Sequence, residues 1–332
     1  MKYFAFFIYL CSIYVSYASA FTLHQQNNFD QTSAFSICGK PEQKLFMYSQ
    51  ADVDNFKHQF AGCKHFLGAI NIDSADIDNL DGLSNLESIF WYLSIVDTVD
   101  LKSLTDLKHL RSVDTLDIEA NQGIRDLRGL EKLTHFNNLL LVKNTNLKDI
   151  NSLTAHNVAS FIFISENPQI RNAVSASYAL SKTSAWLYQL VDNPKLKAIG
   201  PFSTNKGEIN GEIDLDTNLN VENYEFLNKI KKINGRLGLF NMKGLTSLKS
   251  FNNLKDITGR LTIDNLSNLT NLDGLKNLNP NFSGQLYFYD NAQLVDCTAI
   301  CPLMANKDHI IFVNNNEKCV ESLNKCSQVS SK

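Results

Sequence analysis

The interior of the chain repeats one short pattern of apolar and polar positions. Two aliphatic residues separated by one residue are followed, three positions later, by asparagine in most repeats, and then by aliphatic residues at every third position. Leu116, Ile118 and Asn121, followed by Ile124 and Leu127, are one instance. In a β-strand, residues separated by one position point to the same side. Each repeat therefore predicts a short strand with two buried aliphatic side chains.

The repeats follow one another at nearly constant spacing. The asparagine position recurs every 23 to 26 residues, a period typical of leucine-rich repeats. It is occupied by Thr98, Asn121, Asn144, Asn167, Asn193, Asn218, Met242, Leu266, Asn291 and Asn316. One such coil cannot bury its apolar face alone, so neighbouring coils must stack, and each buried Leu or Ile then contributes about 1.5–3 kcal/mol.

These features predict an α/β solenoid that is mainly β. With a less regular first coil around Ile70 and Ile72, we expect a leucine-rich-repeat-like, right-handed stack of about eleven coils. It should have a parallel β-sheet, short convex helical turns and disulfide-linked caps. An Asn at the bend after each strand is expected to hydrogen-bond backbone groups that no sheet partner reaches.

Aliphatic residues at every third position also suit an amphipathic helix, and Leu101, Leu104, Leu107 and Leu110 would fit one. Strict spacing by three drifts around a helix of 3.6 residues per turn, and the intervening Asn, Asp, Gly and Thr are poor helix formers. The solenoid is therefore the favoured interpretation. The small residues of 172–179 indicate a locally thin coil or a hinge, and the thin coil is favoured because the pattern resumes at Tyr188 without a linker.

The two ends of the chain differ from its middle. Lys2, an apolar run and Ala18-Ser19-Ala20 predict a signal peptide over 1–20, since the run is shorter than the ~20 residues of a membrane-spanning helix. We expect an N-terminal cap over 21–68, with a short helix that begins after Ser49. The solenoid then spans 69–296, a cysteine-rich cap 297–326 and a polar tail 327–332.

The seven cysteines lie at the two ends. Removal of the signal peptide takes away Cys11 and leaves six, an even number that suggests three disulfides in an oxidising compartment. The first would join Cys38 to Cys63. The last four cysteines can pair in three ways. We favour the pairing that joins two cysteines lying just after the strands of adjacent coils. The expected C-terminal pairs are Cys297–Cys319 and Cys301–Cys326.

Charge and motifs exclude several classes of function. Without Lys2 the chain has 30 basic and 34 acidic residues, a net charge of −4, so neither nucleic acid nor anionic lipid is an expected partner. No catalytic or cofactor motif is present, and we expect no enzyme activity, cofactor or metal. Cys63-Lys64-His65 is interpreted as a disulfide cysteine beside a surface histidine. The pairs Asp117/Glu119 and Asp214/Asp216 would suit a glycosidase, but we interpret them as solvated sheet residues.

Three sequons indicate a glycoprotein. Asn265, Asn268 and Asn281 each precede a Ser or Thr by two positions. Leu266 and Leu269 are expected to face the interior, which places the two neighbouring asparagines outside. Asn281 lies in a predicted convex loop.

The open face of the sheet is the expected binding surface, because a parallel sheet normally has both faces covered and a solenoid leaves one open. Large outward residues gather there, and cross-strand packing alone is the alternative explanation. The candidate binding residues are Leu140, Val142, Phe161, Phe163, Val191, Phe240, Asp264, Tyr287 and Tyr289. Phe312 is expected on the same face.

A glycine precedes the strand in several coils, as in Ile233-Asn234-Gly235-Arg236-Leu237 and Ile257-Thr258-Gly259-Arg260-Leu261. This phrase resembles the receptor L-domain, a leucine-rich module of insulin and epidermal growth factor receptor ectodomains. The opening, with Cys38 and then Cys63 to Ile72, is similar to fungal cell-wall-organisation and sporulation proteins of the L-domain type. The resemblance covers roughly residues 38–326.

The resemblance implies a role at the cell wall or cell surface, because those fungal proteins are GPI-anchored glycoproteins of wall integrity. The polar residues 327–332 lack the hydrophobic tail of a GPI anchor, and no transmembrane segment is expected in the mature chain. We therefore expect a secreted glycoprotein that binds or scaffolds, with an extracellular protein or a cell-wall polysaccharide as its partner. The alternatives are a soluble receptor-like or decoy module that binds a peptide or protein and, less favoured, a glycan-active enzyme.

Secretion should produce a mature N-terminus at Phe21, because Ala18 and Ala20 supply the small residues that signal peptidase requires. N-terminal sequencing of protein from the culture medium measures this. Secreted protein that retains residues 1–20 would contradict the signal-peptide assignment.

Overall fold

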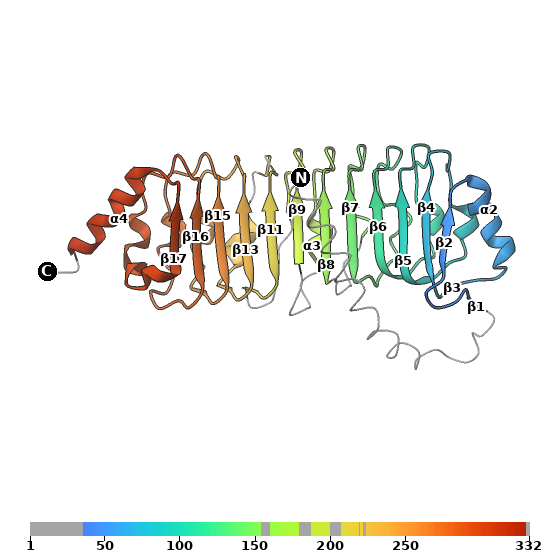
Figure 1. Cartoon of the computed structure of the whole chain (residues 1–332), viewed down its shortest axis with the longest axis horizontal. Helices are drawn as coiled ribbons and strands as arrows, with labels where there is room; N and C mark the ends of the chain where they lie inside the picture. The colour runs from blue at the N-terminus through green and yellow to red at the C-terminus, as the bar shows by residue number, and fades with distance from the viewer. Residues whose placement is uncertain are drawn as a thin grey trace.

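Short parallel strands lie side by side along one face of an elongated stack of coils (Figure 1). The computed structural model describes residues 36–153, 160–178, 187–199, 207–218, 220–221 and 224–329. The predicted signal peptide 1–20, with Cys11, lies outside the described residues. The protein is mainly β, and its strands form a solenoid-like stack as expected.

The strands of the described residues are β1 (Ile37–Cys38), β2 (Lys44–Met47), β3 (His65–Phe66), β4 (Ala69–Asp73), β5 (Ser88–Val96), β6 (Ser112–Glu119), β7 (Asn138–Val142), β8 (Phe161–Ser165), β9 (Leu187–Val191), β10 (Glu208–Ile209), β11 (Glu212–Asp216), β12 (Lys232–Ile233), β13 (Arg236–Phe240), β14 (Asp256–Ile257), β15 (Arg260–Asp264), β16 (Gln285–Tyr289) and β17 (Ile310–Val313). Fourteen of them form one sheet, and β10, β12 and β14 form a second, three-stranded one.

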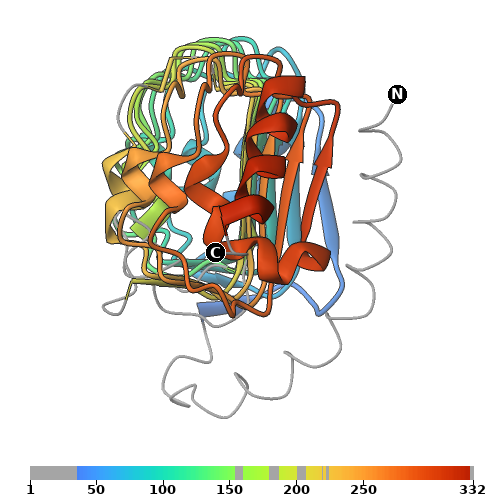
Figure 2. The same ribbon diagram turned by 90° about the vertical axis from the view of Figure 1, so that its left-hand side faces the viewer.

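The helices of the described residues are α2 (Gln50–Gln59), α3 (Val174–Tyr178) and α4 (Glu317–Val329), with 3₁₀ helices η3 (Asp81–Leu83), η4 (Thr105–Leu107), η6 (Glu225–Lys229), η7 (Lys249–Phe251), η8 (Asp273–Leu275) and η9 (Thr298–His309). Most 3₁₀ turns lie on the side opposite the sheet (Figure 2). They are the short convex turns that the sequence predicts. Leu101, Leu104, Leu107 and Leu110 are all buried, yet only Thr105–Leu107 is helical, so a long amphipathic helix is excluded there.

The repeat pattern becomes the core through the strand register. Leu116 of β6 pairs with Leu93 of β5 and Leu139 of β7, and Ile118 continues the row in the same way. Both interior residues of β6 are fully buried. Because every coil places its aliphatic pair at the same height, the coils share one hydrophobic core from end to end.

Eleven strands of the main sheet match the eleven predicted coils: β4, β5, β6, β7, β8, β9, β11, β13, β15, β16 and β17. An additional strand, β2, precedes them and pairs with β4. The sequence did not predict β2. Leu45 and Met47 have the aliphatic spacing of a strand, but no asparagine or regular aliphatic series follows them.

A ladder of buried asparagines runs along one corner of the stack. The backbone N–H of Asn144 donates to Oδ1 of Asn167 at 3.0 Å, and its Nδ2 donates to the carbonyl of Ile118 at 2.8 Å. Its own Oδ1 accepts from the backbone N–H of Asn121 at 3.2 Å. Each asparagine thus joins its coil to both neighbours. The ladder residues are Thr98, Asn121, Asn144, Asn167, Asn193, Asn218, Asn291 and Asn315.

The residue before each ladder position has a left-handed backbone conformation. Ala120 has φ of 57° and Lys143 has φ of 55°. In the last coil the left-handed residue is Asn314, with φ of 54°. This conformation turns the chain sharply out of the strand, at a cost of about 1–2 kcal/mol for a side-chain-bearing residue. The asparagine hydrogen bonds offset the cost by holding the turn in place.

The position of this left-handed turn shows that the ladder residue predicted for the last coil was wrong. Asn315, and not Asn316 as predicted, follows the left-handed residue and bonds to Asn291 with its side chain. Asn316 is partly exposed and donates to the carbonyl of Ala292. The two adjacent asparagines are indistinguishable from spacing alone because the repeat length varies.

Disulfide-linked caps close both ends. The three bonds are Cys38–Cys63, Cys297–Cys319 and Cys301–Cys326, as predicted. At the N-terminal end, Ser49 accepts a hydrogen bond from the backbone of Asp52 and begins α2, which buries Val53 and Phe56 over the first coil. At the other end α4 runs to Val329, so the cap helix continues into the segment assigned to a polar tail.

The thin coil does not interrupt the sheet. β8 and β9 pair in parallel over five residues, from Phe161 with Leu187 to Ser165 with Val191. Between them, Ala173 and Ala176 are buried where other coils have larger aliphatic residues. The stack is therefore continuous at this point, as the sequence favoured.

Asn144→Ala should reduce the free energy of unfolding by about 1–3 kcal/mol, because it leaves buried backbone groups of the adjacent coils without partners. Chemical denaturation followed by circular dichroism measures the loss. Asn146→Ala is the matched control: Asn146 is exposed and makes one bond, to Gln122, so its change should stay within about 0.5 kcal/mol. Equal effects of the two substitutions would contradict the ladder's role.

Candidate ligand-binding surface

The open face of the sheet carries the side chains that alternate with the core residues. In Figure 2 the described helices lie on the opposite side or at the end of the stack, and not over this face. Neighbouring strands pair in register, so outward side chains form rows along the solenoid, as Asp117, Leu140 and Phe163 do. A rigid array of this kind presents a preformed surface.

Six of the predicted binding residues are partly exposed on this face: Leu140, Phe163, Phe240, Asp264, Tyr287 and Tyr289. The expectation was wrong for Val142, Phe161 and Val191, which are only 5%, 8% and 9% exposed. Val142 and Val191 flank the small Ser165 in register, so the row is closely packed at this point. Cross-strand packing therefore explains these three residues.

Phe312 was also assigned to the wrong side. It pairs in register with the core residue Phe288, and the two rings stack with their centroids 4.8 Å apart. The outward residues of β17 are Ile311 and Val313, which are 36% and 41% exposed. At the opposite end the face displays Phe46 and Tyr48, which the sequence analysis missed along with β2.

The middle of the face holds a compact apolar group. Phe163 lies between Leu140 and Gln189 in register, and its ring stacks on that of Phe161 with centroids 6.2 Å apart. Phe161 is buried, so Phe163 and Leu140 are the accessible members of this apolar group.

Of the two acidic pairs expected to be solvated, Glu119 and Asp216 are partly exposed, whereas Asp117 and Asp214 each have a buried carboxylate oxygen. Desolvation raises the pKa of Asp117 to about 6; its Oδ2 accepts from the Ser94 hydroxyl at 3.0 Å, and its Oδ1 is buried without a hydrogen bond. Asp214 is 8% exposed, and burial raises its pKa despite an ion pair with Arg236 at 3.3 Å. Burial among neighbouring side chains removes water from both carboxylates, which disfavours their charged form.

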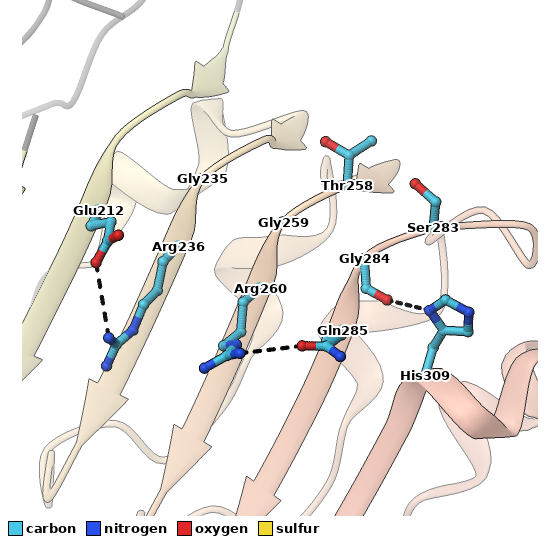
Figure 3. A pocket seen from close by; sticks show the side chains of 10 residues that line it. All are labelled: Glu212, Gly235, Arg236, Thr258, Gly259, Arg260, Ser283, Gly284, Gln285 and His309. Atoms are coloured by element: carbon cyan, nitrogen blue, oxygen red, sulfur yellow. Dashed lines mark hydrogen bonds and ion pairs between the residues drawn. The ribbon is translucent and has the colours of Figure 1, made fainter. Parts of the chain in front are cut away.

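A shallow trough of about 510 Å³ crosses the beginnings of β11, β13, β15 and β16. Figure 3 shows three glycines along it, with charged and polar side chains beside them. The trough is lined by Glu212, Gly235, Arg236, Thr258, Gly259, Arg260, Ser283, Gly284, Gln285 and His309.

The glycines of the trough allow the coils to approach closely. A Cβ at Gly259 would lie 1.8 Å from the carbonyl oxygen of Gly235, and one at Gly284 would lie 2.3 Å from that of Gly259. No side chain can fit between these coils. The hollow is therefore a consequence of tight backbone stacking, bordered by the side chains of the next residues.

The two arginines of the trough differ in their partners. Arg236 pairs with Glu212 at 3.9 Å and with Asp214 at 3.3 Å. Arg260 donates to Oε1 of Gln285 at 3.3 Å and lies over the ring of Tyr287, 4.8 Å from its centroid. Neither arginine is among the binding residues expected from the sequence; their common position directly after the glycine of the repeat is the signal that could have identified them.

The three sequons lie on the surface, and their asparagines are all exposed. The side-chain amide of Asn265 donates to Oδ1 of Asn241, and that of Asn268 to the carbonyl of Lys243. Asn281 makes no side-chain hydrogen bond within the described residues, and Ser283 of its sequon borders the trough. Of the three, Asn281 has the side chain most available for modification.

Comparison of the sequence with models of known protein families and with curated proteins finds no match. Across the described ranges, no helix is long and apolar enough to cross a membrane. The same residues contain no group of three or more His, Cys, Asp or Glu side chains arranged to hold a metal ion. Cys63 is disulfide-bonded, and Nδ1 of His65 lies 2.9 Å from the Ser88 hydroxyl.

Asp117→Asn should stabilise the protein at neutral pH. The raised pKa means that Asp117 favours the folded state below about pH 4, and that this contribution is lost as the pH rises through about 6. The neutral amide avoids the loss, so the variant should gain roughly 2 kcal/mol over wild type at pH 7 and little at pH 4. Denaturation at several pH values measures the difference. The exposed Asp308→Asn is the control, and a pH-independent difference for Asp117→Asn would contradict the assignment.

Proposed function

We propose that this chain is a secreted leucine-rich-repeat protein of the receptor L-domain type, which binds an extracellular ligand through the open face of its sheet. Its role is binding or scaffolding at the cell surface or cell wall. The ligand is an extracellular protein or a cell-wall polysaccharide. The repeat phrases, the parallel sheet and the capped ends support the proposal together.

The observation that carries it is the row of accessible apolar and aromatic side chains on a rigid sheet. Phe163 and Leu140 in the middle, and Tyr287 and Tyr289 towards the C-terminal end, are held on strands that pair on both sides. Binding to such a surface costs little conformational entropy, because the side chains are positioned beforehand. Aromatic residues of this kind are frequent hot spots of recognition.

The three disulfides support an extracellular location. Such bonds form and persist in oxidising compartments and are rare in the cytosol. They join segments at the two ends only, where a solenoid would otherwise expose its core. The exposed sequon asparagines fit the same compartment.

A soluble receptor-like or decoy module for a protein ligand is the second candidate. The apolar group around Phe163 and Leu140 favours it, since a protein contact would bury these side chains. Cell fractionation separates the two candidates. Protein that is released from the wall only by alkali or glucanase supports the wall role, and protein recovered entirely in the medium supports the decoy.

Phe163→Asp and Tyr287→Ala should each weaken ligand binding or wall retention about tenfold or more, while secretion and thermal stability stay near those of wild type. A charge at position 163 disrupts the apolar contact, and loss of the Tyr287 ring removes the support of Arg260. Retention of tagged protein on isolated walls, together with the melting temperature, measures both effects.

Two controls match these variants. Val320→Asp places the same charge on an exposed apolar site of α4, and Tyr48→Ala removes an exposed tyrosine at the far end of the face. Both should retain binding. If Phe163→Asp and Tyr287→Ala bind as wild type does, the ligand site lies on the convex side or the caps.

A further inference from the structure

We infer that the trough across β11, β13, β15 and β16 binds a polysaccharide that carries carboxylate groups, with Arg260 pairing with a sugar carboxylate. The inference rests on the proposed function and specifies the ligand class for one end of the open face. Its basis is the unequal charge compensation of the two arginines and the composition of the trough.

Arg260 is the uncompensated charge of the trough. Arg236 and Arg260 are directly opposite each other on β13 and β15, an arrangement in which like charges destabilise a sheet. Arg236 is neutralised by Glu212 and Asp214, whereas Arg260 has no acidic partner among the described residues. An anion bound beside Arg260 would neutralise its charge, as Glu212 and Asp214 neutralise that of Arg236.

The guanidinium of Arg260 is held in position. Oε1 of Gln285 accepts from both Arg260, at 3.3 Å, and the hydroxyl of Tyr287, at 2.9 Å. Tyr287 also supports the guanidinium with its ring and lies nearly parallel to the ring of Tyr289, 5.7 Å between centroids. These contacts leave N–H groups of Arg260 and Nε2 of Gln285 available to donate. A planar fork with two parallel donors is the geometry that a carboxylate accepts.

The remaining lining is polar and suits sugar hydroxyls. None of the residues of the trough has an apolar side chain. The hydroxyl of Ser283 is exposed, that of Thr258 donates to Asn234 and keeps its acceptor capacity, and His309 directs Nδ1 to the carbonyl of Gly284 at 2.7 Å. Since Nδ1 donates there, Nε2 remains for a ligand. An interface for a folded protein would instead have an apolar centre.

The length of the trough favours a polymer over a small anion. It crosses four strands spaced about 4.8 Å apart and is open along its length. A single inorganic anion would occupy only the neighbourhood of Arg260. Glu212 at the other end repels carboxylates, so the binding of one carboxylate beside Arg260, flanked by hydroxyl-rich units, is the arrangement expected.

The test measures binding of the purified mature protein to polygalacturonate, to its neutral methyl ester and to poly-glutamate by calorimetry. All proteins carry Asn281→Gln, which keeps a glycan away from the trough. Arg260→Gln should weaken polygalacturonate binding at least about tenfold, and Arg260→Lys less, because lysine keeps the charge but loses the fork. Arg128→Gln removes the same charge from a distant exposed site and should bind as the parent does.

Equal losses in Arg260→Gln and Arg128→Gln, or no binding of polygalacturonate by the parent, would overturn the inference. So would equal affinity for the methyl ester, which shows that charge is not recognised, or for poly-glutamate, which indicates an acidic peptide. Wall retention of the Phe163→Asp variant tests the proposed function independently of this inference. If Phe163→Asp reduces wall retention while Arg260→Gln does not, the open face binds a ligand and only the acidic polysaccharide is wrong.

Discussion

The stacking of each coil on the next through buried asparagine side chains is the interaction on which the rest of the structure depends. A chain that leaves a strand and turns sharply exposes backbone groups that no sheet partner can reach. Asn121, Asn144 and Asn167 satisfy these groups from the neighbouring coil, and the same atoms fix the spacing and register of the coils. The left-handed turns, the parallel sheet and the shared core all follow from this register.

The coils around β13 and β15 achieve the same stacking by other means. Met242 and Leu266 replace the ladder asparagine there and are fully buried. These coils instead gain backbone pairing at another corner, in the sheet of β10, β12 and β14, and close backbone contact at Gly235 and Gly259. The trough and its arginines lie directly beside these glycines, so the departure from the ladder and the candidate site share one structural origin.

The open face combines two chemically different regions on one rigid frame. Its middle is apolar around Phe163, and the trough towards its C-terminal end is polar, with Arg260 lacking an acidic partner within the described residues. Between them Asp214 and Arg236 form a partly buried ion pair. Under the proposed function, the apolar region would contact a protein and the polar region a charged glycan.

The sequence by itself determined the repeat, the number of regular coils and most of the interior residues, because strand alternation and coil length are local properties that the aliphatic and asparagine positions express directly. Among the pairings open to the C-terminal cysteines, it favoured the one that the structure shows. It did not determine which outward residues are accessible. Val142, Phe161 and Asp117 are shielded by side chains one coil away in space and more than twenty residues away in the chain. The position of Asn315, the inward turn of Phe312 and the charge imbalance at Arg260 likewise depend on the neighbouring coil. Only the tertiary structure decides these features, since cross-coil distances set burial and ion pairing.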